Sequence, residues 1–129
     1  EGKGQAAADA LLKDGFDFVY VHLQAPDEMG HQGSYERKIQ AIEYLDGRIL
    51  APLVKSLDAS GEDYRIAVLP DHPTPVRLRT HTADAVPYLI FDSRKKRQGG
   101  QIYCERTAAA SGEKIERGCE LMKVLLEQE

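Results

Sequence analysis

The fold expected for this chain depends on residues 16–23, FDFVYVHL. It is short, rich in aromatic and β-branched residues, and directly preceded by Gly15. Such a run predicts a buried β-strand. Residues 24–33 follow and contain Pro26, Gly30 and Gly33. These residues interrupt regular structure, so the segment is predicted to be a loop or a broken turn.

Helices are predicted on both sides of this strand. Residues 5–13 (QAAADALLK) are mostly helix formers, and Gly15 is suited to follow a helix end. Ser34 is a good N-cap for a long amphipathic helix over residues 35–61. Pro52 should kink this helix or begin a new helical segment. The apolar stripe of the helix consists of Ile39, Ile42, Ile49, Leu53 and Leu57.

Further strands and helices complete the pattern. In chain order they are a strand at 64–69, a proline-bounded loop at 70–75, a strand at 86–91, and helices at 105–110 and 118–127. The order strand, helix, strand favours an α/β fold with a parallel crossover, and so a mostly parallel sheet flanked by helices. Ligands of such sheets bind at the carboxyl ends of strands. That rule points to residues 24–33, 71–75 and the stretch just before residue 86.

Length, charge and composition exclude some classes of protein. The length of 129 residues fits one domain, and 17 Lys and Arg against 21 Asp and Glu give a net charge of −4. An acidic chain is a poor nucleic-acid binder, so the basic run 94–97 is interpreted as part of an exposed loop at 93–100. No long apolar run or secretion signal is visible, so we expect no membrane partner. The two cysteines, Cys104 and Cys119, fit a reducing cytoplasm.

The candidate chemistry lies in the segments at the strand ends. Asp27 and His31 share one face if residues 27–31 turn helically. Asp71 and His72 are adjacent after the strand at 64–69, and His81 follows in the next loop. Each of these alone is more often a cap or turn residue, but their conjunction predicts a metal site. Mixed imidazole and carboxylate ligands suit Zn²⁺ or Mn²⁺ better than Ca²⁺. The fourth histidine, His22, is instead expected to be a buried residue of the strand.

Several of these segments resemble one family. The motifs DEMGH (27–31), DHPTP (71–75) and THT (80–82) are similar to the metal-binding segments of cofactor-independent phosphoglycerate mutases. The resemblance is to the archaeal-type branch of these isomerases, within the alkaline phosphatase superfamily. Residues 21–28, 38–46, 84–90, 104–109 and 118–122 resemble the corresponding parts of that branch, so the resemblance covers nearly the whole chain.

The resemblance implies a site for two divalent ions, Mn²⁺ or Zn²⁺, and no organic cofactor. Asp27, His31 and His81 match the ligands of one ion, and Asp71 and His72 match half the ligands of the other. The remaining ligands, among them the nucleophilic Ser or Thr, have no match here, and neither do the residues that bind substrate. The chain therefore resembles the C-terminal part of the metal-binding domain, with residues 1–129 belonging to a partial three-layer alkaline-phosphatase-like fold.

The implied activity is the glycolytic interconversion of 3-phosphoglycerate and 2-phosphoglycerate through a phosphoenzyme. The substrate would be a phosphorylated small molecule in the cytoplasm, and the 129 residues alone are expected to be inactive. A sheet that lacks strands would also favour association between copies. Three alternatives stay open: a homoserine kinase, a phosphatase or phosphonate hydrolase of the same superfamily, or a metal-binding module without catalysis. The sequence that precedes these motifs in the gene would separate an enzyme from a module without catalysis. An assay of the full-length protein with 3-phosphoglycerate, or with homoserine and ATP, would then choose between the mutase and the kinase.

Overall fold

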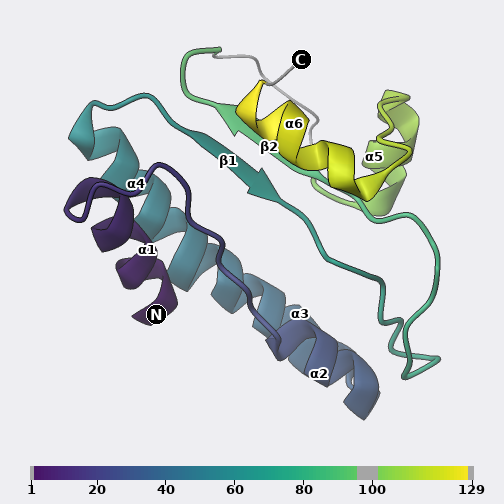
Figure 1. Cartoon of the computed structure of the whole chain (residues 1–129). Helices are drawn as coiled ribbons and strands as arrows, with labels where there is room; N and C mark the ends of the chain where they lie inside the picture. Colours follow the sequence, from purple (N-terminus) through teal and green to yellow (C-terminus); the bar gives the residue numbers. More distant parts are fainter. Residues whose placement is uncertain (1, 96–101, 128–129) are drawn as a thin grey trace. The chain divides into compact units, whose positions relative to one another are not determined.

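The computed structural model describes residues 2–95 and 102–127 (Figure 1). These residues form two compact units. The helical unit consists of Glu1–Glu62 and Thr74–Thr82, and the sheet unit consists of Asp63–Pro73 and Ala83–Glu129. None of the helices in the described part of the chain combines the length and the apolar character that crossing a membrane requires.

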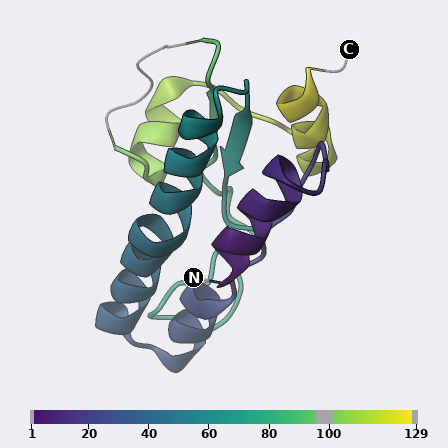
Figure 2. The ribbon, with the colours of Figure 1, turned by 90° about the vertical axis from the view of Figure 1, so that its left-hand side faces the viewer.

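The helical unit contains four α-helices and one π-helical turn. In chain order they are α1 (Gly2–Leu12), α2 (Ala25–Gln32), α3 (Tyr35–Leu45), the turn η1 (Asp46–Leu50) and α4 (Ala51–Ser60). Figure 2 shows that α3, η1 and α4 follow one another as a single rod. This rod confirms the helix predicted over residues 35–61. Ser34 caps its first turn, because the Ser34 hydroxyl accepts a hydrogen bond from the Arg37 amide.

The rod changes from α-helical to π-helical hydrogen bonding just before Pro52, the residue predicted to kink it or to begin a new segment. Pro52 lies in the first turn of α4, and the Ala51 amide donates to the carbonyl of Asp46, five residues earlier. Proline has no amide hydrogen and its ring crowds the preceding turn, so an α-helical ladder cannot continue through it unchanged. The wider π-helical turn takes up this mismatch without ending the rod.

The core of the helical unit lies between α1 and α4, which pack against each other (Figure 1). Ala7, Ala8 and Leu57 are buried there. Gly4 of α1 approaches the π-helical turn closely, since a Cβ at this position would lie 3.2 Å from Ile49 Cγ2. Small residues on α1 therefore allow α1 to approach both η1 and α4 closely. The prediction of a helix at residues 5–13 is confirmed, with a start a few residues earlier.

The strand predicted at residues 16–23 is absent from the described residues. The segment is irregular, although its burial alternates: Val19 and Val21 are partly buried, whereas Phe16 and Tyr20 are 61% and 72% exposed. A strand needs a partner for its backbone hydrogen bonds, and no described segment forms a ladder with this one. His22 lies in this irregular segment and is exposed, so the expectation that it is a buried strand residue is wrong. Association of copies through an unpaired sheet edge stays a prediction.

Residues 24–33 were predicted to be a loop, and this prediction is wrong because they contain α2. Pro26 lies in the first turn of the helix, where a missing amide hydrogen costs nothing. Gly33 ends the helix in the left-handed conformation, with φ 73°. Gly30 lies within α2 and packs against Thr74, so it is explained by a close contact and not by a break in the helix.

The sheet unit contains two strands, β1 (Arg65–Val68) and β2 (Leu89–Asp92). They are antiparallel, with Arg65 opposite Asp92 and Val68 opposite Leu89 (Figure 1). The expected mostly parallel sheet is therefore not present in the described residues, because its first strand, at 16–23, forms no ladder. What the structure has is a mixed α/β arrangement.

The helices of this unit are α5 (Glu105–Ser111), the 3₁₀ turn η2 (Gly118–Glu120) and α6 (Leu121–Leu126). They confirm the two predicted closing helices, and α6 packs against β1. The exposed loop predicted at 93–100 falls largely outside the described residues, since 96–101 are not among them.

A network of ion pairs connects the residue at the end of α6 with both strands of the sheet. Arg65 of β1 pairs with Asp92 of β2 at 2.7 Å and also contacts the carboxylate of Glu127. Lys95 pairs with Glu127, and Arg94 pairs with Asp92 at 2.7 Å. The Arg65 guanidinium, followed by the Lys95 ammonium, lowers the pKa of Glu127 from its ordinary 4.5 to about 2. Hydrogen bonds from Arg94 are the main cause of a lowered pKa at Asp92.

These lowered pKa values predict acid sensitivity. A carboxylate whose pKa is lower in the folded state stabilises the fold above its unfolded pKa, and this stabilisation is lost as pH falls toward the folded value. The free energy of unfolding should therefore decrease between about pH 5 and pH 2. Urea unfolding followed by circular dichroism across this range measures the effect. The Glu127→Gln variant should lose less stability than the wild type over the same range, and equal slopes for the two proteins would contradict the assignment.

Candidate metal centre

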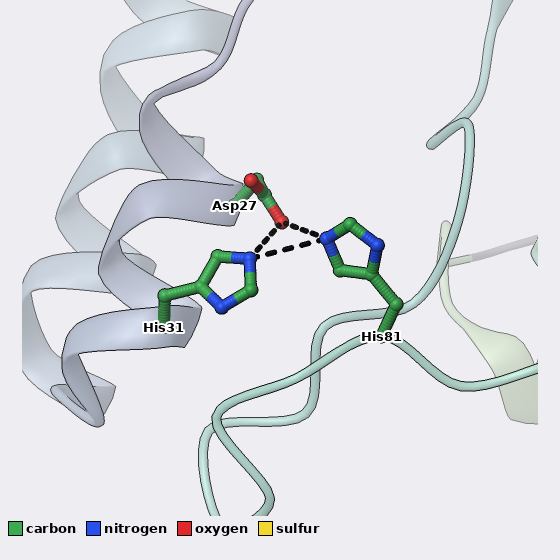
Figure 3. Close-up of side chains that lie close together, drawn as sticks. All are labelled: Asp27, His31 and His81. Carbon is green, nitrogen blue, oxygen red and sulfur yellow. Dashed lines mark hydrogen bonds and ion pairs between the residues drawn. The ribbon is translucent and has the colours of Figure 1, made fainter.

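Two side chains of α2 and one of the loop at 74–82 point toward a common space (Figure 3). Asp27 and His31 are four residues apart, so the helix places them on the same face one turn from each other. His81 reaches them from the loop, 50 residues further along the chain than His31. All three belong to the helical unit.

The three ligand-type atoms lie at nearly equal separations. Asp27 Oδ1 is 3.4 Å from His31 Nε2 and 3.3 Å from His81 Nε2. The two Nε2 atoms are 3.1 Å apart. Ligands bound tetrahedrally to one zinc ion, at about 2.0–2.1 Å each, are separated from one another by about 3.3 Å. The triangle therefore has the dimensions of one face of a metal coordination shell.

The orientation of the His31 ring is fixed from the opposite side. His31 Nδ1 donates a hydrogen bond to the carbonyl of Arg79 at 2.9 Å, because a carbonyl oxygen only accepts. In the neutral ring, Nε2 then carries the free lone pair and directs it toward Asp27 and His81. A histidine that binds a metal is typically held in this way through its other nitrogen.

The backbone of Arg79 is strained to provide that carbonyl. Arg79 has φ 55°, in the left-handed region that residues other than glycine seldom adopt. Its amide donates to the carbonyl of Pro75 at 2.9 Å, which closes a tight turn before His81. Conformations of this kind persist only where surrounding contacts impose them, and they occur often at functional sites.

The donor set fits a divalent cation. One carboxylate oxygen and two imidazole nitrogens are ligands that Zn²⁺ and Mn²⁺ accept, whereas Ca²⁺ prefers oxygen alone. A proton on His81 Nε2 can point along one edge of the triangle, toward either His31 Nε2 or Asp27 Oδ1. A cation would satisfy all three donors at once. The side chains are partly exposed, so the space between them is open to solvent.

The two other predicted ligands, Asp71 and His72, lie in the loop that follows β1 in the sheet unit. The His72 amide donates to Asp71 Oδ1 at 3.1 Å, and His72 Nε2 lies 3.6 Å from Asp71 Oδ2. They are thus close to each other, and their role as ligands of a second ion stays a prediction. His22 is not part of the cluster; its ring stacks on Tyr20 with centroids 6.2 Å apart.

Two contacts of this site were not predicted from the sequence. One is the bond from His31 to the Arg79 carbonyl, for which an arginine side chain gives no signal. The other is a hydrogen bond from Thr74 Oγ1 to Asp27 Oδ1 at 2.5 Å. For this second contact, the only signal was the place of Thr74 in the motif DHPTP.

Comparison with known proteins agrees with a metal site. The profile of the Metalloenzyme superfamily matches residues 1–120. A probable 2,3-bisphosphoglycerate-independent phosphoglycerate mutase of Geobacter sulfurreducens is 42% identical over 129 residues, which are 99% of this chain and 32% of that protein. A 2,3-bisphosphoglycerate-independent phosphoglycerate mutase of Methanosarcina acetivorans is 45% identical over 112 residues, covering 87% of this chain and 28% of that protein.

A solved protein structure from Pyrococcus horikoshii is also similar. It superimposes with a TM-score of 0.84 at 29% identity, over 97% of this chain and 36% of that one. The chain thus spans about a third of the length of the proteins that it matches.

Proposed function

Because this chain belongs to the Metalloenzyme superfamily, we propose that it supplies part of the metal centre of a cofactor-independent phosphoglycerate mutase. The observation that carries the proposal is the triangle of Asp27, His31 and His81, whose ligand atoms lie 3.1–3.4 Å apart. The resemblance of the chain to mutases at 42–45% identity supports the choice of reaction. The substrate is then a phosphorylated small molecule, 3-phosphoglycerate or 2-phosphoglycerate.

The complete site holds two divalent ions, Mn²⁺ or Zn²⁺, in this proposal. Asp27, His31 and His81 hold one ion, while Asp71 and His72 provide two ligands of the other. The remaining ligands and the hydroxyl nucleophile come from outside these residues. Further strands, also from outside residues 1–129, complete a mostly parallel sheet in a three-layer alkaline-phosphatase-like fold. Free Cys104 and Cys119 agree with a cytoplasmic enzyme.

The residues in and beside the triangle have different roles in this proposal. Asp27 contributes the one negative charge, and the two neutral imidazoles add donors without adding charge. The Arg79 carbonyl keeps His31 in the tautomer that leaves Nε2 free. Three protein donors with an open side leave room for a substrate oxygen. When bound, the ions stabilise the charge of the transferring phosphoryl group and promote ionisation of the hydroxyl nucleophile.

The proposal can be tested with a chimera. The matching 112 residues of the Methanosarcina acetivorans relative are replaced by those of this chain, a segment that contains all five predicted ligands. With Mn²⁺ present, the purified chimera should convert 3-phosphoglycerate to 2-phosphoglycerate, and the unmodified relative serves as the positive control. A second assay offers homoserine and ATP. A folded, metal-binding chimera that fails in the first assay, or is active only in the second, would overturn the assignment.

A further inference from the structure

We infer that Thr74 is a positioning residue that holds the Asp27 carboxylate in the orientation required for metal binding. This inference rests on the proposed metal centre and extends it to a residue that does not itself contact the ion. Thr74 lies at the start of the loop that carries His81, 47 residues from Asp27 in the sequence. It therefore connects the loop to the helix that provides the other two donors.

The burial of Thr74 is unusual. The residue is 4% exposed, and within residues 2–95 and 102–127 it is the one polar residue buried this deeply. A buried hydroxyl must form a hydrogen bond or destabilise the fold. Thr74 Oγ1 donates to Asp27 Oδ1 at 2.5 Å, a length typical of a hydroxyl bound to an ionised carboxylate. The hydroxyl thus donates to Asp27, and the residue is turned away from solvent.

Contacts from α2 and α3 fix the position of Thr74. The Lys38 ammonium of α3 donates to the Thr74 carbonyl at 2.6 Å. Gly30 of α2 lies directly against the same residue: a Cβ at Gly30 would be 2.6 Å from Thr74 O and 2.9 Å from Thr74 Cγ2. A glycine in the middle of a helix costs stability, so its presence here is explained by this close approach.

The hydrogen bond determines which way the carboxylate faces. Rotation of an aspartate carboxylate about its last bond meets only a broad, shallow barrier. Oδ1 accepts the hydrogen bond of the Thr74 hydroxyl and at the same time faces the Nε2 atoms of His31 and His81. Without the hydroxyl, the carboxylate would have to be ordered when the metal binds, and the affinity would fall. Loss of a residue that orients a metal ligand typically costs about 10–100-fold in affinity.

The experiment compares Thr74→Val, which removes the hydroxyl but keeps the shape, with Thr74→Ser, which keeps the hydroxyl. Zn²⁺ and Mn²⁺ affinities of the 129-residue chain are measured by calorimetric titration. We expect Thr74→Val to bind about 10–100-fold more weakly and Thr74→Ser to bind within a few-fold of the wild type. The control is Tyr20→Phe, which removes an exposed hydroxyl of the same helical unit and should leave the affinity unchanged.

Two further readouts separate positioning from a purely structural role. Urea unfolding without metal shows whether Thr74→Val is folded, and Thr74→Ala replaces it as the hydroxyl-free variant if it is not. Equal affinities of the wild type and the hydroxyl-free variant would overturn the role of Thr74 while leaving the metal centre intact. Equal losses in the hydroxyl-free variant and Thr74→Ser would overturn it too. Failure of the wild type to bind either metal would overturn the metal centre itself.

Discussion

Replacing His81 by alanine is expected to lower the affinity of the chain for Zn²⁺ or Mn²⁺ by more than about 100-fold, beyond the loss typical of residues that only orient a ligand. His81 is the donor that comes from the loop, whereas Asp27 and His31 both lie on α2. Without it, only two donors face the site, and the triangle with sides of 3.1–3.4 Å is lost. Calorimetric titration of the 129-residue chain measures the change. In the chimera, the same substitution should abolish mutase turnover.

The matched control for this variant is His22→Ala. His22 is exposed, lies in the same helical unit and is not part of the cluster. Its loss should leave metal affinity unchanged, which separates a specific ligand from general histidine binding of metal ions. If His81→Ala bound Zn²⁺ as tightly as the wild type, or if both variants lost affinity equally, His81 would not be a ligand.

Replacing Gly30 by alanine is expected to destabilise the helical unit by about 1–3 kcal/mol, the usual cost of forcing extra volume into a packed contact. The added Cβ would stand 2.6 Å from the carbonyl oxygen of Thr74, so α2 and the loop at 74–82 must separate. This separation also moves Asp27 away from His81, and metal affinity should fall together with stability. Urea unfolding and metal titration of the same preparation measure the two effects.

A second glycine provides the control for this substitution. Gly47 lies in the π-helical turn η1, and a Cβ built there meets no atom within 4 Å. Gly47→Ala should therefore stabilise the chain by about 0.5–1 kcal/mol, because alanine loses less backbone entropy than glycine in a helix. If Gly30→Ala were also stabilising, the contact between Gly30 and Thr74 would not be as close as described.

Local sequence signals predicted most of the elements that depend on neighbouring residues. The helix formers before Gly15, the cap at Ser34, the interruption at Pro52 and the strand that became β1 all involve interactions within a few residues. Two of the wrong predictions, the strand at 16–23 and the loop at 24–33, have different causes. Residues 16–23 have the composition of a strand but no ladder partner among the described segments, and pairing is not a property of one segment.

The loop predicted at residues 24–33 was wrong because proline and glycine there were interpreted as interruptions of regular structure. In residues 24–33, Pro26 opens a helix, Gly33 ends it, and Gly30 makes room for Thr74. Only the last of these depends on a residue far along the chain. Pro26 and Gly33 are thus local signals of a helix start and a helix end, and they favour a helix together with the spacing of Asp27 and His31.

The motifs predict that Asp27, His31 and His81 converge with Asp71 and His72 beside them. The structure brings the first three together, and the place of Asp71 and His72 beside them stays a prediction. The supporting contacts were not predictable, because they join residues 47 and 48 positions apart. Thr74 acts through a buried hydroxyl, and Arg79 acts through a backbone carbonyl in an uncommon conformation. Neither property is visible in the residue type.

Asp27, His31 and His81 are proposed to hold one divalent ion. The most direct measurement is anomalous diffraction from crystals of the chain grown with Zn²⁺ or Mn²⁺. We expect an anomalous peak at bonding distance, about 2.0–2.2 Å, from Asp27 Oδ1 and the Nε2 atoms of His31 and His81. Crystals grown in excess metal that show no peak between these three atoms, or a peak held only by other residues, would contradict it.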